Sequence, residues 1–251
     1  MVTKQVIARL DDLRVAAAFL TRLPVPAPEG KGMEAVAGAC RAYPLVGAGI
    51  GLAAGAVCLA AQAMGLGVWL AAIMAVTCQA LLSGALHEDG LADVADGLGA
   101  YDKERRLEIM RDSRIGAYGV LALILATALR VAALASLAGN ALPALVVAAA
   151  LSRAVMAWPM AMLPSARADG LAAGAGRPAR TRVAEGTVIA MVLALAIAGL
   201  PGLLAAALAA FAALSVARLA ERSLGGTTGD VIGATQVVAE IAVLVTLTAL
   251  Y

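Results

Sequence analysis

Residues 187–217 read TVIAMVLALAIAGLPGLLAAALAAFAALSVA and contain no charged side chain. An apolar run of this length is typical of a chain that crosses a lipid bilayer. The segment Gly199-Leu-Pro-Gly202 lies near its middle, and glycine and proline break helices. The run therefore predicts two membrane helices joined by a short turn, of which the first is short.

The composition of the whole chain points the same way. It has 251 residues, of which 62% are hydrophobic and 14% are charged, whereas soluble domains are about a quarter charged. The net charge of +2 is too balanced for a nucleic-acid-binding protein. We therefore expect one integral membrane domain, residues 1–251, with lipid as its partner and no nucleic acid.

The order of apolar and polar segments predicts an all-α, polytopic membrane protein with about seven transmembrane helices. The expected spans are residues 44–64, 68–86, 118–138, 141–163, the two parts of 187–217, and 231–251. An amphipathic helix is expected over residues 5–20, where Leu10, Leu13 and Leu20 share one face. Such a helix suits the membrane interface.

Positive charge predicts the orientation of these spans. The short turns at 65–67, 139–140 and 199–202 contain no Lys or Arg, and 17 of the 19 basic residues lie in the N-terminal segment or the opposite loops. The positive-inside rule then places the N-terminus and the charged loops in the cytoplasm. An odd number of spans leaves the C-terminus outside.

Three glycines in the first span are four residues apart. Gly47, Gly51 and Gly55 form a ridge along one helix face, where the lack of side chains lets another helix approach closely. The ridge permits contacts within the chain and also between chains, so a homo-oligomer is compatible with the sequence.

An acidic motif follows the second span: Leu86-His-Glu-Asp-Gly-Leu-Ala-Asp-Val-Ala-Asp-Gly-Leu-Gly-Ala100. If the end of the span continues as a helix, Asp89, Asp93 and Asp96 share one face. Stacked like charges repel, and a bound cation relieves the repulsion. Carboxylate oxygens suit Mg²⁺, so the motif predicts a divalent-metal site.

A second acidic row comprises Glu104, Glu108 and Asp112, and arginines at positions 105, 106, 111 and 114 are interleaved with it. Metal-binding carboxylates beside phosphate-binding guanidiniums suit phosphoryl transfer. A solvated loop rich in charges is the alternative interpretation of Glu104 and Glu108. His87, the one histidine, is either a metal ligand, a general base or a supporting residue bonded to a carboxylate.

Asp93-x-x-Asp-Gly-x-x-Ala100 resembles the start of the CDP-alcohol phosphotransferase signature. Tyr101 stands where that signature has arginine, so a CDP-alcohol phosphotransferase-like lipid enzyme is the alternative function. A small transporter is the non-enzyme alternative. It would need polar groups at mid-membrane depth, where only Arg130, Arg153 and Glu240 are ionisable.

A closer resemblance is to cobalamin synthase, the adenosylcobinamide-GDP ribazoletransferase family. The matching segments are Phe19-Leu-Thr-Arg-Leu-Pro-Val-Pro26, Tyr43-Pro-Leu-Val-Gly47, Gly84-Ala-Leu-His-Glu-Asp-Gly-Leu-Ala-Asp-Val-Ala-Asp-Gly97, Arg106-Leu-Glu-Ile-Met-Arg-Asp-Ser-Arg-Ile-Gly-Ala-Tyr-Gly119 and Gly225-Gly-Thr-Thr-Gly-Asp-Val-Ile-Gly-Ala234. Their order and spacing agree over nearly the whole chain.

The resemblance implies a reaction at the bacterial inner membrane with a cytoplasmic active site. The hydroxyl of α-ribazole, or of its 5′-phosphate, attacks the corrinoid-linked phosphorus of a GDP-activated corrinoid, and GMP leaves. Mg²⁺ is the implied cofactor.

The resemblance also implies roles for individual residues. Asp89, Asp93 and Asp96, with Glu88 or Asp112, hold Mg²⁺, while Asp112 or Asp96 accepts the hydroxyl proton. Arg111, Arg114 and Arg153 clamp phosphates. Arg153 lies roughly 15 Å inside its span by helical rise, a depth at which an arginine is usually functional. Arg130 has a similar role or pairs with Glu240.

The loop Gly225–Asp230 opens the last span. Its free amides, with Thr227, Thr228 and Asp230, suit a bound phosphate, because N–H groups at a helix start point outward. A plain helix-start loop with Asp230 near the cap is the alternative interpretation.

Overall fold

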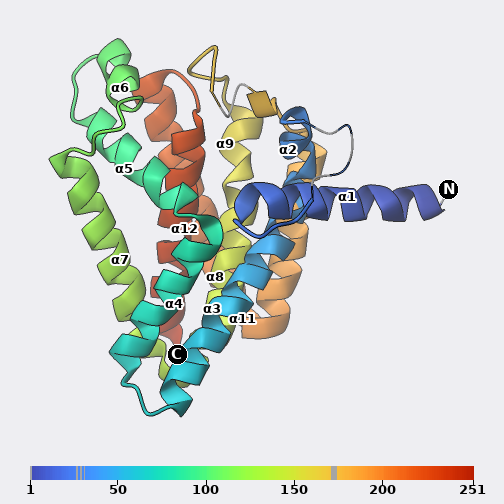
Figure 1. Cartoon of the computed structure of the whole chain (residues 1–251), viewed down its shortest axis with the longest axis vertical. Helices are drawn as coiled ribbons and strands as arrows, with labels where there is room; N and C mark the ends of the chain where they lie inside the picture. The colour runs from blue at the N-terminus through green and yellow to red at the C-terminus, as the bar shows by residue number, and fades with distance from the viewer. Residues whose placement is uncertain (1, 27, 29, 31, 171–173) are drawn as a thin grey trace.

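The computed structural model describes residues 2–26, 28, 30, 32–170 and 174–251, and in this part of the chain the helices are joined by loops, without a β-strand. The helices are α1 (Val2–Leu20), α2 (Glu34–Gly38), η1 (Ala39–Ala42), α3 (Tyr43–Ala63), α4 (Val68–Ser83), α5 (Leu86–Leu98), α6 (Lys103–Ile109), α7 (Ala117–Leu137), η2 (Ala138–Asn140), α8 (Ala141–Val155), α9 (Ala157–Met162), α11 (Arg180–Leu224) and α12 (Gly229–Leu250). The long helices form an upright bundle around α8 (Figure 1).

The expected count of seven spans is not confirmed. Among the described residues, five helical segments are long and apolar enough to cross a bilayer, and a sixth crossing results if α4 and α5 count as one bent span. This number counts α11 once, although a break divides it. The prediction of an all-helical, multi-pass membrane protein is confirmed.

The predicted break in residues 187–217 is present inside α11. Gly199 has φ 61° and ψ −140°, which is not helical and which glycine adopts without a Cβ clash. A Cβ on Gly202 would lie 2.2 Å from the carbonyl oxygen of Ala194, eight residues earlier. The two halves of α11 therefore fold back on each other.

The glycine ridge of α3 packs against α8. A Cβ on Gly47 would lie 2.2 Å from the carbonyl oxygen of Ala149, and a Cβ on Gly51 would lie 2.4 Å from that of Leu145. Gly55 meets Leu142 in the same way. The predicted close approach is confirmed, and since α8 fills the ridge, the ridge itself leaves no room for a second chain.

The second expected span does not continue straight into the acidic motif. It ends at Ser83, and α5 departs from α4 at an angle of 92°. Gly84 and Ala85 both adopt left-handed conformations, with φ 64° and 55°. A left-handed alanine is costly, so surrounding contacts must hold this corner.

The N-terminal helix is confirmed as α1, which lies across the bundle rather than along it (Figure 1). Its Ala16 and Leu20 are buried, while Leu10 and Leu13 are exposed on the outer surface. This arrangement suits a helix in the membrane interface, which remains a prediction.

Candidate functional site

Helix α5, which carries the acidic motif, packs against the start of α12. A Cβ on Gly90 would lie 2.7 Å from the carbonyl oxygen of Asp230, and a Cβ on Gly233 would lie 3.2 Å from the backbone of His87. These glycines let the two backbones touch. Two motifs that are well separated in sequence are thus brought together at one end of the bundle (Figure 1).

Four side chains form what we call the rim cluster: Asp89, Asp93, Asp230 and Arg167. Asp93 lies within electrostatic reach of the other three. The Arg167 guanidinium donates to Asp230 at 3.4 Å and to the Leu107 carbonyl at 3.1 Å. Asp89 is exposed and Asp93 is half-buried, so this cluster is open to solvent on one side.

Asp96 turns to α7 instead. Its two carboxylate oxygens accept hydrogen bonds from the backbone N–H groups of Gly116 and Gly119, at 2.7 and 2.8 Å. These donors belong to the first turn of α7, where N–H groups lack helical partners. Asp96 therefore caps α7 from a neighbouring helix.

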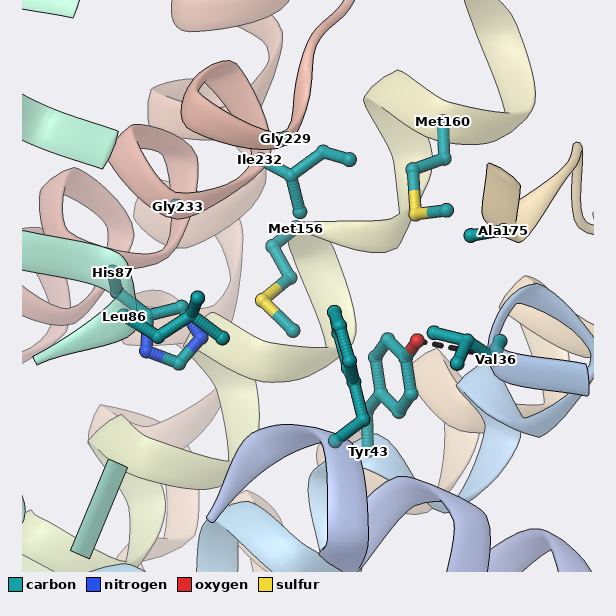
Figure 2. Close-up of a pocket in the computed structure, with 11 residues that line it drawn as sticks. Val36, Tyr43, Leu86, His87, Met156, Met160, Ala175, Gly229, Ile232 and Gly233 are labelled. Carbon is teal, nitrogen blue, oxygen red and sulfur yellow. Dashed lines mark hydrogen bonds between the residues drawn. The ribbon is translucent and has the colours of Figure 1, made fainter. Parts of the chain in front are cut away.

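His87 lines a small cavity together with Tyr43, Met156 and Met160 (Figure 2). Its Nε2 atom has no hydrogen-bond partner among the described residues. The cavity volume of about 40 Å³ is well below the ~150 Å³ of a cavity that admits benzene. The cavity is thus too small for a substrate, and no described carboxylate is hydrogen-bonded to His87.

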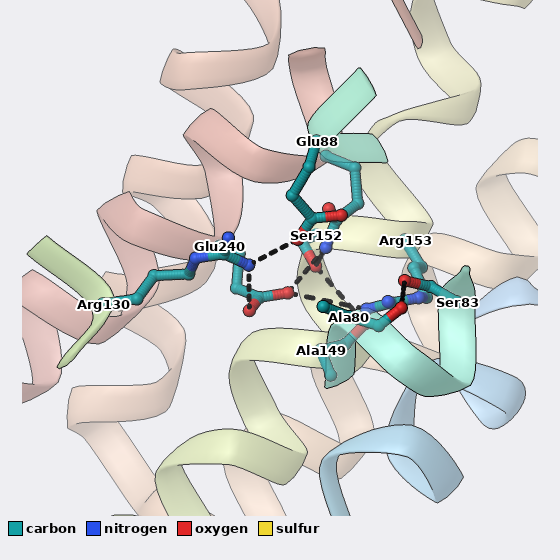
Figure 3. Close-up of polar contacts among 9 residues, drawn as sticks. Ala80, Ser83, Glu88, Arg130, Ala149, Ser152, Arg153 and Glu240 are labelled. Carbon is teal, nitrogen blue, oxygen red and sulfur yellow. Dashed lines mark hydrogen bonds and ion pairs between the residues drawn. The ribbon is translucent and has the colours of Figure 1, made fainter. Parts of the chain in front are cut away.

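Glu88 belongs to a second group, which we call the buried cluster: Glu88, Arg130, Arg153 and Glu240 (Figure 3). Arg130 donates to Glu88 at 2.9 Å and lies 3.8 Å from Glu240. Arg153 lies 3.5 Å from Glu240. Arg130 therefore pairs with Glu240, as one of the two interpretations of the sequence expected, and it lies closer to Glu88.

The four expected metal ligands do not converge. Glu88 faces Arg130 and Asp96 faces α7, while Asp89 and Asp93 face α12. Across the described residues, no three His, Cys, Asp or Glu side chains are placed to hold a metal ion. The residues of the motif, as they stand, do not fit a ready-made Mg²⁺ site.

The loop before α12 is tied down through its backbone. The Thr227 N–H donates to the Pro164 carbonyl, and the Ala166 N–H donates to the Thr227 carbonyl, both at 2.8 Å. Thr228 is the N-cap of α12, because its Oγ1 accepts from the Val231 N–H at 3.2 Å. These bonds match the alternative of a helix-start loop, although Asp230 still reaches the rim cluster.

The second acidic row is interrupted. Helix α6 ends at Ile109, so Asp112 does not share a helix face with Glu104 and Glu108. Hydrogen bonds from the Arg114 side chain and backbone lower the pKa of Asp112 to about 2. A carboxylate held in this way is a weak base.

All three arginines expected to bind phosphates have protein partners, and that of Arg114 is Asp112. Arg111 forms an ion pair with Asp169 on the exposed surface. Arg153 is 2% exposed and donates to the Ala149 carbonyl as well as pairing with Glu240. Its burial agrees with a position inside a span, and its contact with a substrate phosphate stays a prediction.

Two features were missed from the sequence. Arg167 stands at the start of a polar segment that gave no motif, yet it is the cation of the rim cluster. Gln236 supports the buried cluster by donating to Glu240 at 2.6 Å and to Ser152 at 3.0 Å. Gln236 and Glu240 are four residues apart in the last span, and this spacing was the available signal.

Comparisons with known proteins identify the family of the chain. The family model described as cobalamin-5-phosphate synthase matches residues 12–248. An adenosylcobinamide-GDP ribazoletransferase of Sinorhizobium sp is 47% identical over 248 residues, covering 93% of this chain and 94% of the relative. A protein with the same description from Bradyrhizobium diazoefficiens is 46% identical and covers 93% of this chain and 91% of its own length. One from Mesorhizobium japonicum is 43% identical and covers 94% of this chain and 92% of its own length.

No solved structure matches the chain. The family match spans nearly all of the sequence, including the acidic motif and the loop before α12. The chain therefore belongs to the cobalamin-5-phosphate synthase family.

Proposed function

We propose that this protein joins α-ribazole, or its 5′-phosphate, to a GDP-activated corrinoid at the bacterial inner membrane. In this step a ribazole hydroxyl oxygen forms a bond to the corrinoid-linked phosphorus. The bond from that phosphorus to the bridging oxygen breaks, and GMP leaves with the electron pair. The hydroxyl proton passes to a carboxylate of the enzyme.

The observation that carries this proposal is the meeting of α5 and α12 at the rim cluster. Asp89 and Asp93 come from the acidic motif, and Asp230 comes from the loop that opens the last span. Relatives that cover 93% of this chain are named adenosylcobinamide-GDP ribazoletransferase, which is the same activity. A cluster of carboxylates beside a guanidinium suits proton acceptance next to a diphosphate.

Roles at the rim follow from which groups are free to act. Asp93 is our candidate for accepting the hydroxyl proton, because Asp96 and Asp112 are each held by hydrogen-bond donors. Arg167 borders the cluster and is our candidate for a diphosphate contact, with Arg111 and Arg114 farther out on the exposed surface. Bidentate guanidinium contacts are strong with phosphate oxygens.

The proposal includes a cytoplasmic active site. The acidic helix α5, the charged helix α6 and the start of α12 lie toward one end of the bundle (Figure 1). The positive-inside rule favours the cytoplasm for this end, because 17 of the 19 Lys and Arg residues lie in the N-terminal segment or in the loops expected on this side of the membrane. A nucleotide-linked substrate would then reach the site from the cytoplasm.

Mg²⁺ dependence also stays part of the proposal. The carboxylates of the motif are the ligand type that Mg²⁺ prefers, although they do not form a ready-made set.

The test uses the full chain, purified in detergent, with adenosylcobinamide-GDP and α-ribazole. GMP and the joined corrinoid product are measured together, with and without Mg²⁺. We expect both products in equal amounts, and only when Mg²⁺ is present. Folded protein that forms neither product would overturn the proposed function, and equal turnover in the presence of a chelator would overturn the Mg²⁺ requirement alone.

A further inference from the structure

The buried cluster joins four helices at the centre of the bundle. Glu88 comes from α5, Arg130 from α7, Arg153 from α8 and Glu240 from α12 (Figure 3). The distances of 2.9 Å from Arg130 to Glu88 and 3.8 Å from Arg130 to Glu240 make Arg130 the link between α5 and α12.

Burying this cluster costs free energy, because its charged groups lose their hydration. Arg130, Arg153 and Glu240 are 3%, 2% and 1% exposed. The two guanidiniums balance the two carboxylates, yet Glu88 Oε2, Glu240 Oε1 and both arginine Nε atoms lack hydrogen-bond partners in the described part of the chain. Buried ion pairs with incomplete hydrogen bonding contribute little to stability, so stability alone is a weak reason for their presence.

Helix α5 needs an anchor because it is not a continuation of α4. The two left-handed residues Gly84 and Ala85 separate the helices at the 92° corner, so α4 does not fix the direction of α5 through helical hydrogen bonds. Two carboxylates of the motif instead tie α5 to α7: Glu88 near its start, through Arg130, and Asp96 near its end, through the N–H groups of Gly116 and Gly119.

Between these two ties lie Asp89 and Asp93, the members of the motif that face Asp230. Glu88 immediately precedes Asp89, so a rotation of α5 that moved one would move the other. Glu240 lies ten residues along α12 from Asp230, roughly 15 Å by helical rise, and is enclosed in the bundle. Neither Arg130 nor Glu240 contacts the rim cluster directly.

We propose that Arg130, held by Glu240, is a positioning residue that fixes Glu88 and thereby sets the rotation of α5 at the rim cluster. This inference rests on the proposed function for its kinetic readout. Displacement of a reacting group by about 1 Å can cost about 10²-fold in rate. Loss of the anchor therefore lowers kcat without removing any group from the rim.

The test is the double variant Arg130→Met/Glu240→Gln, which removes one charge of each sign and leaves Glu88 and the rim cluster unchanged. We expect kcat for GMP release to fall by about 10²-fold, with a much smaller change in KM for the GDP-activated corrinoid. Hydrogen exchange should become faster in peptides covering residues 86–98 and stay unchanged in α3, which carries no member of the buried cluster. The exchange readout does not depend on activity.

Two further variants make the result specific. Arg130→Lys keeps the positive charge and should recover much of kcat and of the protection of α5. Thr235→Val changes an equally buried side chain of α12 that bonds only within its own helix, and it should match the wild type.

A folded double variant with wild-type kcat and wild-type exchange in α5 would overturn the proposal. So would a loss of protection spread evenly over all helices, which would indicate general destabilisation. A wild-type protein that forms no GMP would instead contradict the proposed function, while the exchange experiment would still decide whether Arg130 anchors α5.

Discussion

The rim cluster and the buried cluster both draw on the acidic motif of α5, but they treat its charges differently. The rim cluster has three carboxylates and one guanidinium and is open to solvent, with the Asp230 side chain 23% exposed. The buried cluster has two charges of each sign, and Arg130, Arg153 and Glu240 are sealed inside the bundle. Surplus negative charge lies where a substrate can arrive, and balanced charge lies where only helices meet.

This contrast separates the carboxylates that we propose take part in the reaction from the charged residues that hold the helices together. Solvent can stabilise an imbalance at the rim, so its carboxylates are free to exchange protons or bind a cation. The interior cannot do so, and a buried charge there persists only with partners. The same short stretch, residues 88–96, therefore serves two purposes through neighbouring positions.

The largest expected effect is on activity at the rim. Asp93→Asn keeps the size of the side chain but removes the base, so kcat for GMP release should fall by about 10²–10⁴-fold. The thermal midpoint in detergent should change little, because Asp93 is only half-buried. Near-normal turnover would show that Asp93 is not the proton acceptor.

The second effect is on stability in the interior. Arg130→Met alone leaves Glu88 and Glu240 with a single arginine between them, and breaking a buried pair costs about 3–5 kcal/mol. Denaturant or thermal unfolding in detergent should show a loss of this size. A variant as stable as the wild type would mean that the two carboxylates are neutral or solvated, and the contrast between the clusters would disappear.

A third change separates the helices without altering any charge. Gly90→Ala would place a Cβ 2.7 Å from the backbone oxygen of Asp230, so α5 must move away from α12. We expect kcat to fall by about tenfold and stability to fall by about 1–3 kcal/mol. Gly49→Ala is the matched control, because a Cβ there meets nothing within 4 Å; equal behaviour of the two variants would argue against close α5–α12 contact.

The smallest effect concerns pH. Hydrogen bonds from Arg114 lower the pKa of Asp112 from its ordinary value of 3.8 to about 2. The ion pair is therefore complete above about pH 4, and any stability that it contributes is lost only as pH falls toward 2. Asp112→Asn should leave unchanged the pH at which kcat for GMP release falls on the acid side. A shift of that pH would indicate that Asp112 is the base.

Much of the fold was readable from local patterns. The uncharged run with Gly199 inside it predicted the break in α11, and the spacing of Gly47, Gly51 and Gly55 predicted close packing. Both features depend on backbone properties of glycine that neighbours in sequence reveal.

The partners of the charged residues were not readable in the same way. Nothing near Asp96 in sequence indicates that α7 begins beside it, and nothing near Arg153 indicates Glu240. The corner at Ala85 was hidden too, because alanine normally continues a helix. Such pairings arise only when helices that are distant in sequence pack together. The motif therefore predicted a site with carboxylates, but it did not predict which of its carboxylates lie at the rim and which bind α7.

The central claim is that α5 and α12 contribute to one working site, and a double-mutant cycle of Asp93→Asn and Asp230→Asn tests it most directly. The measurement is kcat/KM for GMP release by the wild type, both single variants and the double variant. Residues that act as a unit are strongly non-additive, so the double variant should be about as active as the weaker single variant. Losses that simply multiply would contradict the account, because they would show that the two carboxylates work independently.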